Sequence, residues 1–265
     1  MAYADDLNTE QKNNIALLKG AMEAGGITNP YSQAALLAIV SKESSFYPKR
    51  ENMNYSSKRI REVWPSISSE LANKLANNPE DLANYVYVQK PIGYRNDGYG
   101  NTKAKDGFNY RGGGYNQLTF KGSYEKYGKR LGIPLGTKPS LIENPDVSAK
   151  VVVEFMNDRF KQLKNNGKLK EYGGASDIND FKDLNNATMA FYHANSGSAK
   201  SVSKIKGMAT NDKLGGMKKA LARVPSLYTL ASKTLGIVKK NPIPTAIAVA
   251  GFIVGIYILI KYIKK

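Results

Sequence analysis

The segment from Asn29 to Pro48 carries both end signals of a helix and an apolar pattern between them. Asn29 can cap the helix, Pro30 suits its first position, and Pro48 prevents its continuation. Apolar side chains recur at helical spacing between these ends, at Leu36, Ile39 and Val40. The sequence therefore predicts a helix around residues 32–45 with one buried stripe.

Signals of further helices occur along the chain. Asn8 or Thr9 can open a helix that stops at Gly25 and Gly26. Another begins at 145–146, and a short buried one is predicted at 187–194. The helix that begins at 145–146 has four plausible buried positions: Val147, Val151, Phe155 and Phe160. Because neither strand-helix alternation nor an internal repeat is visible, we expect a mainly α fold.

Glu43 occupies the next position of the apolar stripe in the helix at 32–45. Burial disfavours the charged form of a carboxyl group, which suits a general acid. A helix-end glutamate that reaches solvent, or that pairs with Lys42 or Lys49, is the alternative interpretation.

A second candidate element is the segment 107–119, which contains three consecutive glycines at 112–114. Rings and amides bracket the glycines: Phe108, Asn109, Tyr110, Tyr115, Asn116 and Gln117. Glycines let a backbone approach a ligand closely, so this composition predicts binding of a polar, flat-faced ligand such as a sugar. A phosphate loop is disfavoured because no Gly-Lys-Ser/Thr ending follows. A tight turn between two elements remains the structural alternative.

Several blocks of sequence occur in a characteristic order: Lys42-Glu43-Ser44-Ser45, Glu51-Asn52-Met53-Asn54-Tyr55-Ser56, Gly100-Asn101, Asp106-Gly107, Tyr110-Arg111-Gly112-Gly113-Gly114-Tyr115-Asn116-Gln117-Leu118-Thr119 and Asn144-Pro145-Asp146. This order resembles glycoside hydrolase family 19, which holds chitinases and lysozyme-type endolysins. The likeness covers about residues 35–146, with a weaker match at 194–197. The short spacing between Glu43 and Glu51 is more similar to the endolysin branch than to the plant chitinases.

The resemblance implies a lysozyme-like, two-lobed α-helical domain with a central cleft, and inverting hydrolysis of a β-1,4 bond beside N-acetylglucosamine. Glu43 matches the general acid, Glu51 the base that activates water, and Thr119 the residue that helps to hold that water. An inverting enzyme keeps its two carboxyl groups roughly 6.5 to 9.5 Å apart. Substrate-binding positions are implied at Tyr55, Tyr110, Arg111, Tyr115, Gln117 and Asn195.

The chain departs from the family pattern at four positions. Gly113 replaces the second arginine of the motif, Asn116 stands at a usually apolar position, Lys42 replaces a histidine, and Ser123 replaces an asparagine. Both proposed carboxylates are retained. For Glu51, an exposed side chain paired with Arg50 is the alternative to a catalytic role.

The C-terminal end carries a separate signal, because residues 241–260 contain no charged side chain. A helix needs about 20 apolar residues to cross a bilayer, so we expect a transmembrane helix at 243–263. Lysines flank this segment as interfacial anchors would: Lys239, Lys240, Lys261, Lys264 and Lys265. Gly251 and Gly255 form a small-xxx-small pair through which the helix could form a homodimer.

These signals divide the chain into a catalytic domain at 1–221, a linker at 222–242 and the membrane helix at 243–263. The acidic start of the chain does not resemble a secretory signal. We therefore expect a single-pass protein of a virion membrane or a bacterial inner membrane, with its enzyme domain acting on the cell wall.

Composition is compatible with this organisation. Cysteine is absent, which excludes disulfides and thiolate chemistry, and His193 is the single histidine. His193 lies among apolar neighbours and is predicted to be a structural hydrogen-bonding residue; no cofactor or metal is expected. The formal net charge of +17 favours anionic surfaces such as bacterial walls and lipid headgroups. Nucleic acid is not expected as a partner because no binding motif is recognised.

Two classes of function follow from the sequence. The first is a membrane-anchored muramidase-type endolysin that cleaves the glycan strands of peptidoglycan, for viral lysis or entry, with chitin hydrolysis as the alternative substrate class. The second is a catalytically inactive relative that binds the wall or serves as a scaffold.

Overall fold

The computed structural model describes residues 6–88 and 99–210, together with residues 220, 222–223, 225–227 and 229. Within these residues the regular elements are helices, and extended pairing is limited to an isolated bridge between Gly113 and Leu118. The elements are α1 (Thr9–Ala24), α2 (Pro30–Ser44), α3 (Ser57–Val63), α4 (Ser69–Leu75), α5 (Pro79–Val88), α6 (Asp106–Asn109), α7 (Lys121–Leu131), η4 (Pro139–Glu143), α8 (Pro145–Asn165), η5 (Leu169–Glu171), α9 (Leu184–Ser196) and α10 (Val202–Thr210). The prediction of a mainly α fold is confirmed.

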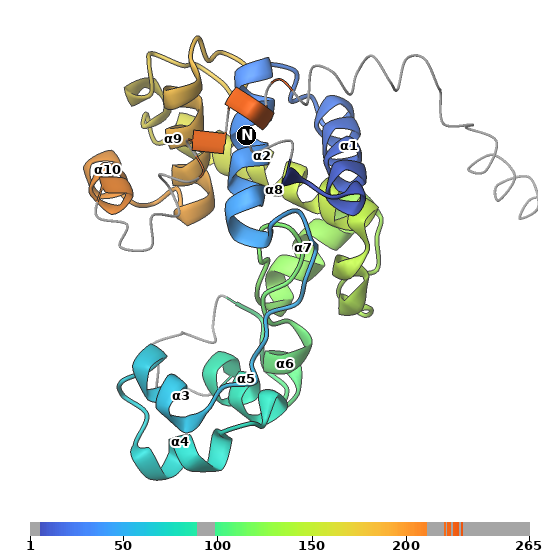
Figure 1. Ribbon diagram of the computed structural model, residues 1–265, viewed down its shortest axis with the longest axis vertical. Coiled ribbons are helices and arrows are strands. Elements are labelled where there is room, and N and C mark those ends of the chain that lie inside the picture. The colour runs from blue at the N-terminus through green and yellow to red at the C-terminus, as the bar shows by residue number, and fades with distance from the viewer. Residues whose placement is uncertain are drawn as a thin grey trace, which may run out of the picture.

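The helices form two lobes, as Figure 1 shows. The larger lobe contains α1, α2 and α7 to α10, and the smaller lobe contains α3 to α6. Each lobe has its own hydrophobic core. The chain passes from the larger to the smaller lobe after α2 and returns after α6. This arrangement is consistent with a lysozyme-like helical fold.

The first two helices begin and end where the sequence predicts. The side chains of Asn8 and Gln11 form a reciprocal capping box at the start of α1, which ends before Gly25. Asn29 Oδ1 accepts hydrogen bonds from two backbone N–H groups at the start of α2, where Pro30 occupies the first turn. The end of α2 is set by Ser45, which adopts the left-handed conformation with φ of 52°.

The helix α2 lies in the interior of the larger lobe. Leu36, Ile39 and Val40 of the predicted stripe are buried, and so are the residues between them. Every residue from 34 to 40 is at most 1% exposed. The helices α1 and α9 both pack against α2, and the buried side chains of α9 include Ala187, Ala190 and Ala194. The helix α2 is therefore enclosed on more than one side.

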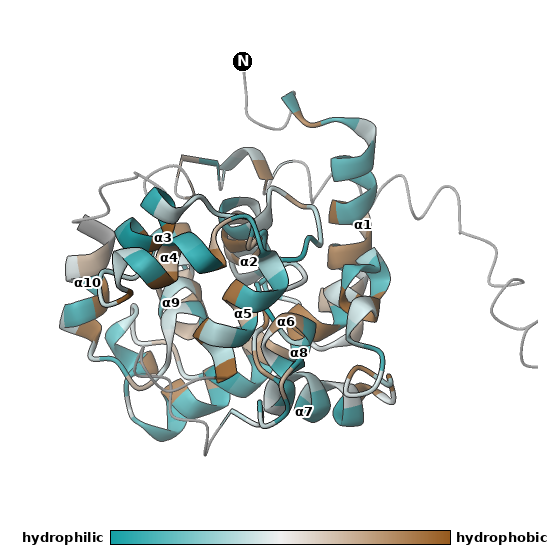
Figure 2. Ribbon diagram, turned by 90° about the horizontal axis from the view of Figure 1, so that it is seen from below, coloured by the Kyte–Doolittle hydropathy of each residue, from teal (hydrophilic) through white to brown (hydrophobic). Residues whose placement is uncertain are grey.

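The longest helix, α8, connects the other elements of the larger lobe. It contacts α1, α7 and α9. Of its predicted buried positions, Val151, Phe155 and Phe160 are buried, whereas Val147 is partly exposed. The helix α1 lies on the outside of this lobe, and Figure 2 shows hydrophilic and hydrophobic residues along its length.

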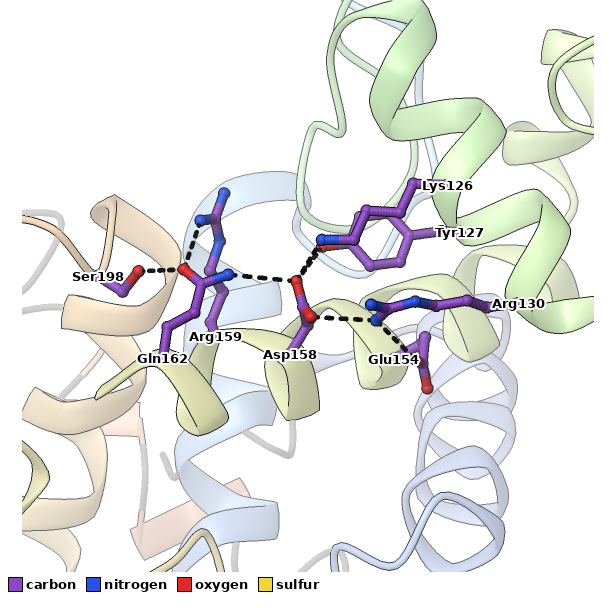
Figure 3. A network of polar contacts seen from close by, with 8 residues as sticks. All are labelled: Lys126, Tyr127, Arg130, Glu154, Asp158, Arg159, Gln162 and Ser198. Carbon is purple, nitrogen blue, oxygen red and sulfur yellow. Dashed lines mark hydrogen bonds and ion pairs between the residues drawn. The ribbon is translucent and has the colours of Figure 1, made fainter. Parts of the chain in front are cut away.

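A network of polar contacts joins α7, α8 and the loop that follows α9, as Figure 3 shows. Asp158 of α8 accepts hydrogen bonds from Lys126 Nζ at 2.6 Å and from Arg130 Nη1 at 3.1 Å. Gln162 of α8 links Asp158 to Ser198, whose Oγ donates to Gln162 Oε1 at 2.5 Å. Burial alone would raise the pKa of Asp158, but the hydrogen bonds from Lys126 and Arg130 outweigh it and hold that pKa below its ordinary value.

The described C-terminal residues lie against the larger lobe. Ala220 and Leu227 are fully buried in its core, and Arg223 Nη1 donates to Ser41 Oγ at 2.7 Å. Part of the segment predicted as a linker at 222–242 therefore packs on this lobe. Across the described part of the chain, the helices are too short or too polar to span a bilayer. The span predicted at 243–263 lies outside the described residues.

We predict that the Asp158→Asn substitution lowers the free energy of unfolding at pH 7 by about 1 to 3 kcal/mol, because Lys126 and Arg130 lose a charged acceptor. Since the folded-state pKa is lowered, this stabilisation is present above the unfolded pKa of about 3.9 and is lost as pH falls through the folded pKa. The difference between wild type and variant should therefore narrow below about pH 4 in urea denaturation experiments.

The matched control is Asp146→Asn on the same helix. Asp146 pairs with Lys150, but its side chain is 54% exposed, against 12% for Asp158. Exposed pairs contribute about 0 to 1 kcal/mol, so this control should have the smaller effect. Equal losses in the two variants would contradict a special role of the Asp158 network.

Candidate functional site

The glycine-rich segment forms a short hairpin between the two lobes. Gly113 and Leu118 exchange two backbone hydrogen bonds, of 3.0 and 2.7 Å, and residues 114–117 form the turn. Gly114 and Gln117 have φ of 74° and 53°, both in the left-handed region. The tight turn considered as the structural alternative is therefore what this segment forms.

Two of the three glycines serve packing within the protein, so the expectation that the run faces a ligand is wrong for them. A Cβ on Gly113 would lie 2.6 Å from Tyr124 Oη, and a Cβ on Gly114 would lie 2.7 Å from Ser148 Oγ. Both would also lie 2.9 Å from an atom of Ile142. The backbone approaches the α7–α8 region too closely for side chains at these positions.

The remaining glycine, Gly112, faces two of the predicted site residues. A Cβ at this position would lie 2.9 Å from Gln117 Oε1 and 3.3 Å from Glu51 Oε2. Gln117 is held in place because its Nε2 donates to the carbonyl oxygens of Lys49 and Gly114. The hairpin thus brings the carboxylate of Glu51 and the amide of Gln117 to the same small surface.

Glu51 is half-buried and has a defined hydrogen-bond partner. Its backbone N–H donates to Gly112 O at 2.7 Å, and its Oε2 accepts from Tyr87 Oη at 2.7 Å. The alternative of a pair between Glu51 and Arg50 is wrong: the Arg50 guanidinium donates instead to the backbone carbonyls of Pro139, Phe108 and Asn109. The Glu51 Oε1 atom has no hydrogen bond to a described residue.

Arg111 supports the backbone at the junction of the lobes. Its Nε donates to Glu51 O at 3.1 Å, its Nη1 donates to Phe108 O at 2.7 Å, and its guanidinium lies 3.8 Å from the centre of the Phe108 ring. Burial, together with the nearby charge of Arg50, lowers the pKa of Arg111 from its ordinary value. The polar contacts of this predicted substrate-binding residue are thus made to the protein itself.

Glu43 lies in the last turn of α2 and is partly buried, with 23% of its side chain exposed. Its Oε1 accepts from Lys42 Nζ at 2.8 Å and from Asn195 Nδ2 at 3.1 Å. Pairing with Lys42, one of the alternatives raised by the sequence, is therefore present. This pairing involves only Oε1 of Glu43, and Oε2 has no hydrogen bond to a described residue.

The other predicted site residues are placed in different surroundings. Thr119 is partly buried, and its Oγ1 donates to Gln117 O at 3.0 Å. The partly buried ring of Tyr55 lies 5.9 Å from that of Trp64 in the smaller lobe. Tyr110 and Tyr115 are 6% and 0% exposed and belong to the main core, so their rings offer little or no surface to a ligand.

The contacts arrange the candidate residues in two groups. Glu51, Gln117 and Thr119 are gathered around the hairpin, whereas Glu43 and Asn195 meet where α2 packs on α9. No hydrogen bond or ion pair within the described ranges joins one group to the other directly.

Tyr87, the side-chain partner of Glu51, was not predicted from the sequence. It lies near the end of α5 and follows the buried Val86. Its ring packs edge-on against Phe120 with a centroid separation of 5.6 Å. The helical position of Tyr87 next to the buried face of α5 was the available signal, but the sequence does not show that this face meets the hairpin.

The prediction that His193 is structural is confirmed. His193 is fully buried, its Nδ1 is 2.8 Å from Tyr172 Oη, and its Nε2 is 3.0 Å from Lys200 O. Burial lowers the pKa of His193, and the charges of Lys168 and Lys200 act in the same direction. The neutral ring with its proton on Nε2 satisfies both contacts.

Comparison with known proteins identifies the family of the chain. No protein-family model matches the chain. A glycosyl hydrolase family 19 domain-containing protein of Haemophilus influenzae is 33% identical over 143 residues, which are 52% of this chain and 67% of the relative. The chain belongs to glycosyl hydrolase family 19.

We predict that Gly113→Ala lowers the free energy of unfolding by about 1 to 3 kcal/mol, because the added methyl group overlaps Tyr124 and Ile142. Thermal unfolding followed by circular dichroism measures the loss. The control is Gly20→Ala in α1, where nothing lies within 4 Å of the added Cβ and alanine favours the helix by about 0.5 to 1 kcal/mol. A Gly113→Ala protein as stable as wild type would show that the hairpin can move away from α7 and α8.

Proposed function

We propose that the protein is an endolysin-type enzyme that cleaves β-1,4-glycosidic bonds of peptidoglycan by an inverting acid/base reaction. The observation that carries the proposal is the state of its two carboxylates. In Glu43 and in Glu51, one oxygen is held by hydrogen bonds and the other has no hydrogen bond to a described residue. Membership of glycosyl hydrolase family 19 supports the reaction class.

The two carboxylates have different surroundings, as an acid and a base must have. Glu43 protonates the glycosidic oxygen as the bond to the anomeric carbon breaks. Glu51 takes a proton from the water that attacks this carbon from the opposite face of the sugar. Tyr87 fixes one oxygen of Glu51. Thr119, whose Oγ1 donates to Gln117 O, is assigned to holding that water.

Peptidoglycan is the proposed substrate because the chain is strongly basic. Its formal net charge of +17 attracts it to anionic bacterial walls. The apolar segment at 243–263 is proposed as a membrane anchor, and delivery in a virion membrane or insertion in a bacterial inner membrane would bring the enzyme to the wall. Chitin is the second candidate, and the products released from chitin and from peptidoglycan distinguish the two substrates.

We expect Glu43→Gln to abolish clearing of purified peptidoglycan in a zymogram of the full-length protein, since the amide cannot donate the required proton. General acid catalysis contributes about 10² to 10⁴ in rate, which sets the expected loss. Glu70→Gln is the control, because Glu70 is 80% exposed and pairs with Lys74 on the surface of the smaller lobe. Equal clearing by wild type and Glu43→Gln would refute the assignment of the acid, and an inactive wild type would favour a wall-binding protein.

Tyr87→Phe should lower kcat about tenfold, because the carboxylate of Glu51 loses the hydroxyl that orients it. Stability should change by about 1 kcal/mol, the usual net contribution of one hydrogen bond. The matched control on the same helix is Tyr85→Phe, since the Tyr85 hydroxyl makes no hydrogen bond to a described residue. Steady-state kinetics on soluble glycan fragments measures both variants, and unchanged kcat in Tyr87→Phe would argue against Glu51 as the base.

A further inference from the structure

Two side chains from two different helices donate to the same oxygen of Glu43. Lys42 Nζ, from α2, lies 2.8 Å from Oε1, and Asn195 Nδ2, from α9, lies 3.1 Å from the same atom. An ammonium and an amide NH₂ group can only donate hydrogen bonds. The Oε1 atom must therefore act as an acceptor in this arrangement.

Lys42 is held in position by its surroundings. Its side chain is 24% exposed, and its Nζ lies 5.7 Å from the centre of the Tyr192 ring. Tyr192 and Asn195 are three residues apart on α9, so they lie on the same face of that helix. One face of α9 thus supplies both the amide that contacts Glu43 and the ring that supports Lys42.

Asn195 is also fixed, because the loop that follows its helix is anchored to Lys168, which precedes η5, and to α8. Lys168 Nζ donates to three consecutive backbone carbonyls, those of Ser198, Ala199 and Lys200, at 2.7 to 3.0 Å. The Asp158 network reaches the same loop through Ser198. The end of α9 therefore has little freedom to move away from Glu43.

We propose that Lys42 and Asn195 are positioning residues that fix Oε1 of Glu43 as an acceptor, so that the proton is carried and delivered by Oε2. The proton leaves Oε2 for the glycosidic oxygen as the bond to the anomeric carbon breaks, and the carboxylate that remains has the Lys42 ammonium at its other oxygen. The inference rests on the proposed function of Glu43 as the acid. Lysine at position 42 acquires a role that the local sequence does not reveal.

The test compares kinetics of full-length variants on soluble glycan fragments. Lys42→Met keeps a side chain that can pack on Tyr192 but removes the donor; kcat should fall about tenfold to a hundredfold with KM within about twofold. Lys42→Arg should recover part of kcat, because it restores a charged donor. Lys150→Met is the control: it removes a lysine from an ion pair of 2.7 Å with Asp146, on the outer part of α8.

Because both donors act on one oxygen, Lys42→Met and Asn195→Ala should not be additive in kcat: the double variant should lose less than the product of the two single losses. Strict additivity, or a change in KM alone, would overturn the proposal.

A second measurement does not need turnover. The ¹⁵N resonance of the Asn195 side-chain amide should move in Lys42→Met and in Glu43→Gln but not in Lys150→Met. An inactive wild type would overturn the proposed function. An Asn195 resonance that stays unchanged in Lys42→Met would instead contradict the shared contact of Lys42 and Asn195 with Oε1 of Glu43.

Discussion

The packing of α2 between α1 and α9 is the constraint on which the candidate site depends. Buried on more than one side, α2 cannot shift along its axis or rotate without disrupting the main core, so its last turn is fixed. Glu43 projects from this last turn, where the helix dipole opposes negative charge. Lys42 and Asn195 place a positive charge and an amide dipole next to the carboxylate and offset that cost. The same core that stabilises the larger lobe thus determines where the proposed acid lies.

The second carboxylate depends on a different set of contacts, at the junction of the lobes. Glu51 belongs to the segment that follows α2. Its backbone N–H donates to Gly112 O, and its backbone carbonyl oxygen accepts from the Arg111 side chain, so the glycine-rich segment holds both polar groups of its backbone. Arg50 and Arg111 both donate to Phe108 O, at the end of the smaller lobe. Charged donors are used here to satisfy backbone carbonyls where the chain changes lobes, a region in which helices cannot supply these hydrogen bonds. Tyr87 then connects the carboxylate itself to the smaller lobe.

The sequence predicted those features that depend on neighbouring residues. The limits of α1 and α2 follow from caps such as Asn29, whose partners lie within three residues, and the mainly α class follows from the absence of strand patterns. Features that depend on distant residues were missed. The small space at Gly114 is created by Ser148 and Ile142, and Tyr87 meets Glu51 only because the lobes fold together. Asn116, noted as polar at a usually apolar position, has both side-chain polar atoms buried without a partner in the described structure, and no local pattern explains this.

The pair of non-glycine residues with positive φ at the end of α2 has a consequence for how the site is built. Ser45 and Phe46 have φ of 52° and 65°, and Phe46 is fully buried, so the backbone cannot relax without extracting an aromatic ring from the core. Such conformations cost about 1 to 3 kcal/mol each and persist where the surrounding structure enforces them. The direction in which the chain leaves the helix is consequently rigid. This rigid start of the segment after α2 limits where Glu51 can lie relative to Glu43, and the contacts of Glu51 with the hairpin and Tyr87 determine the rest.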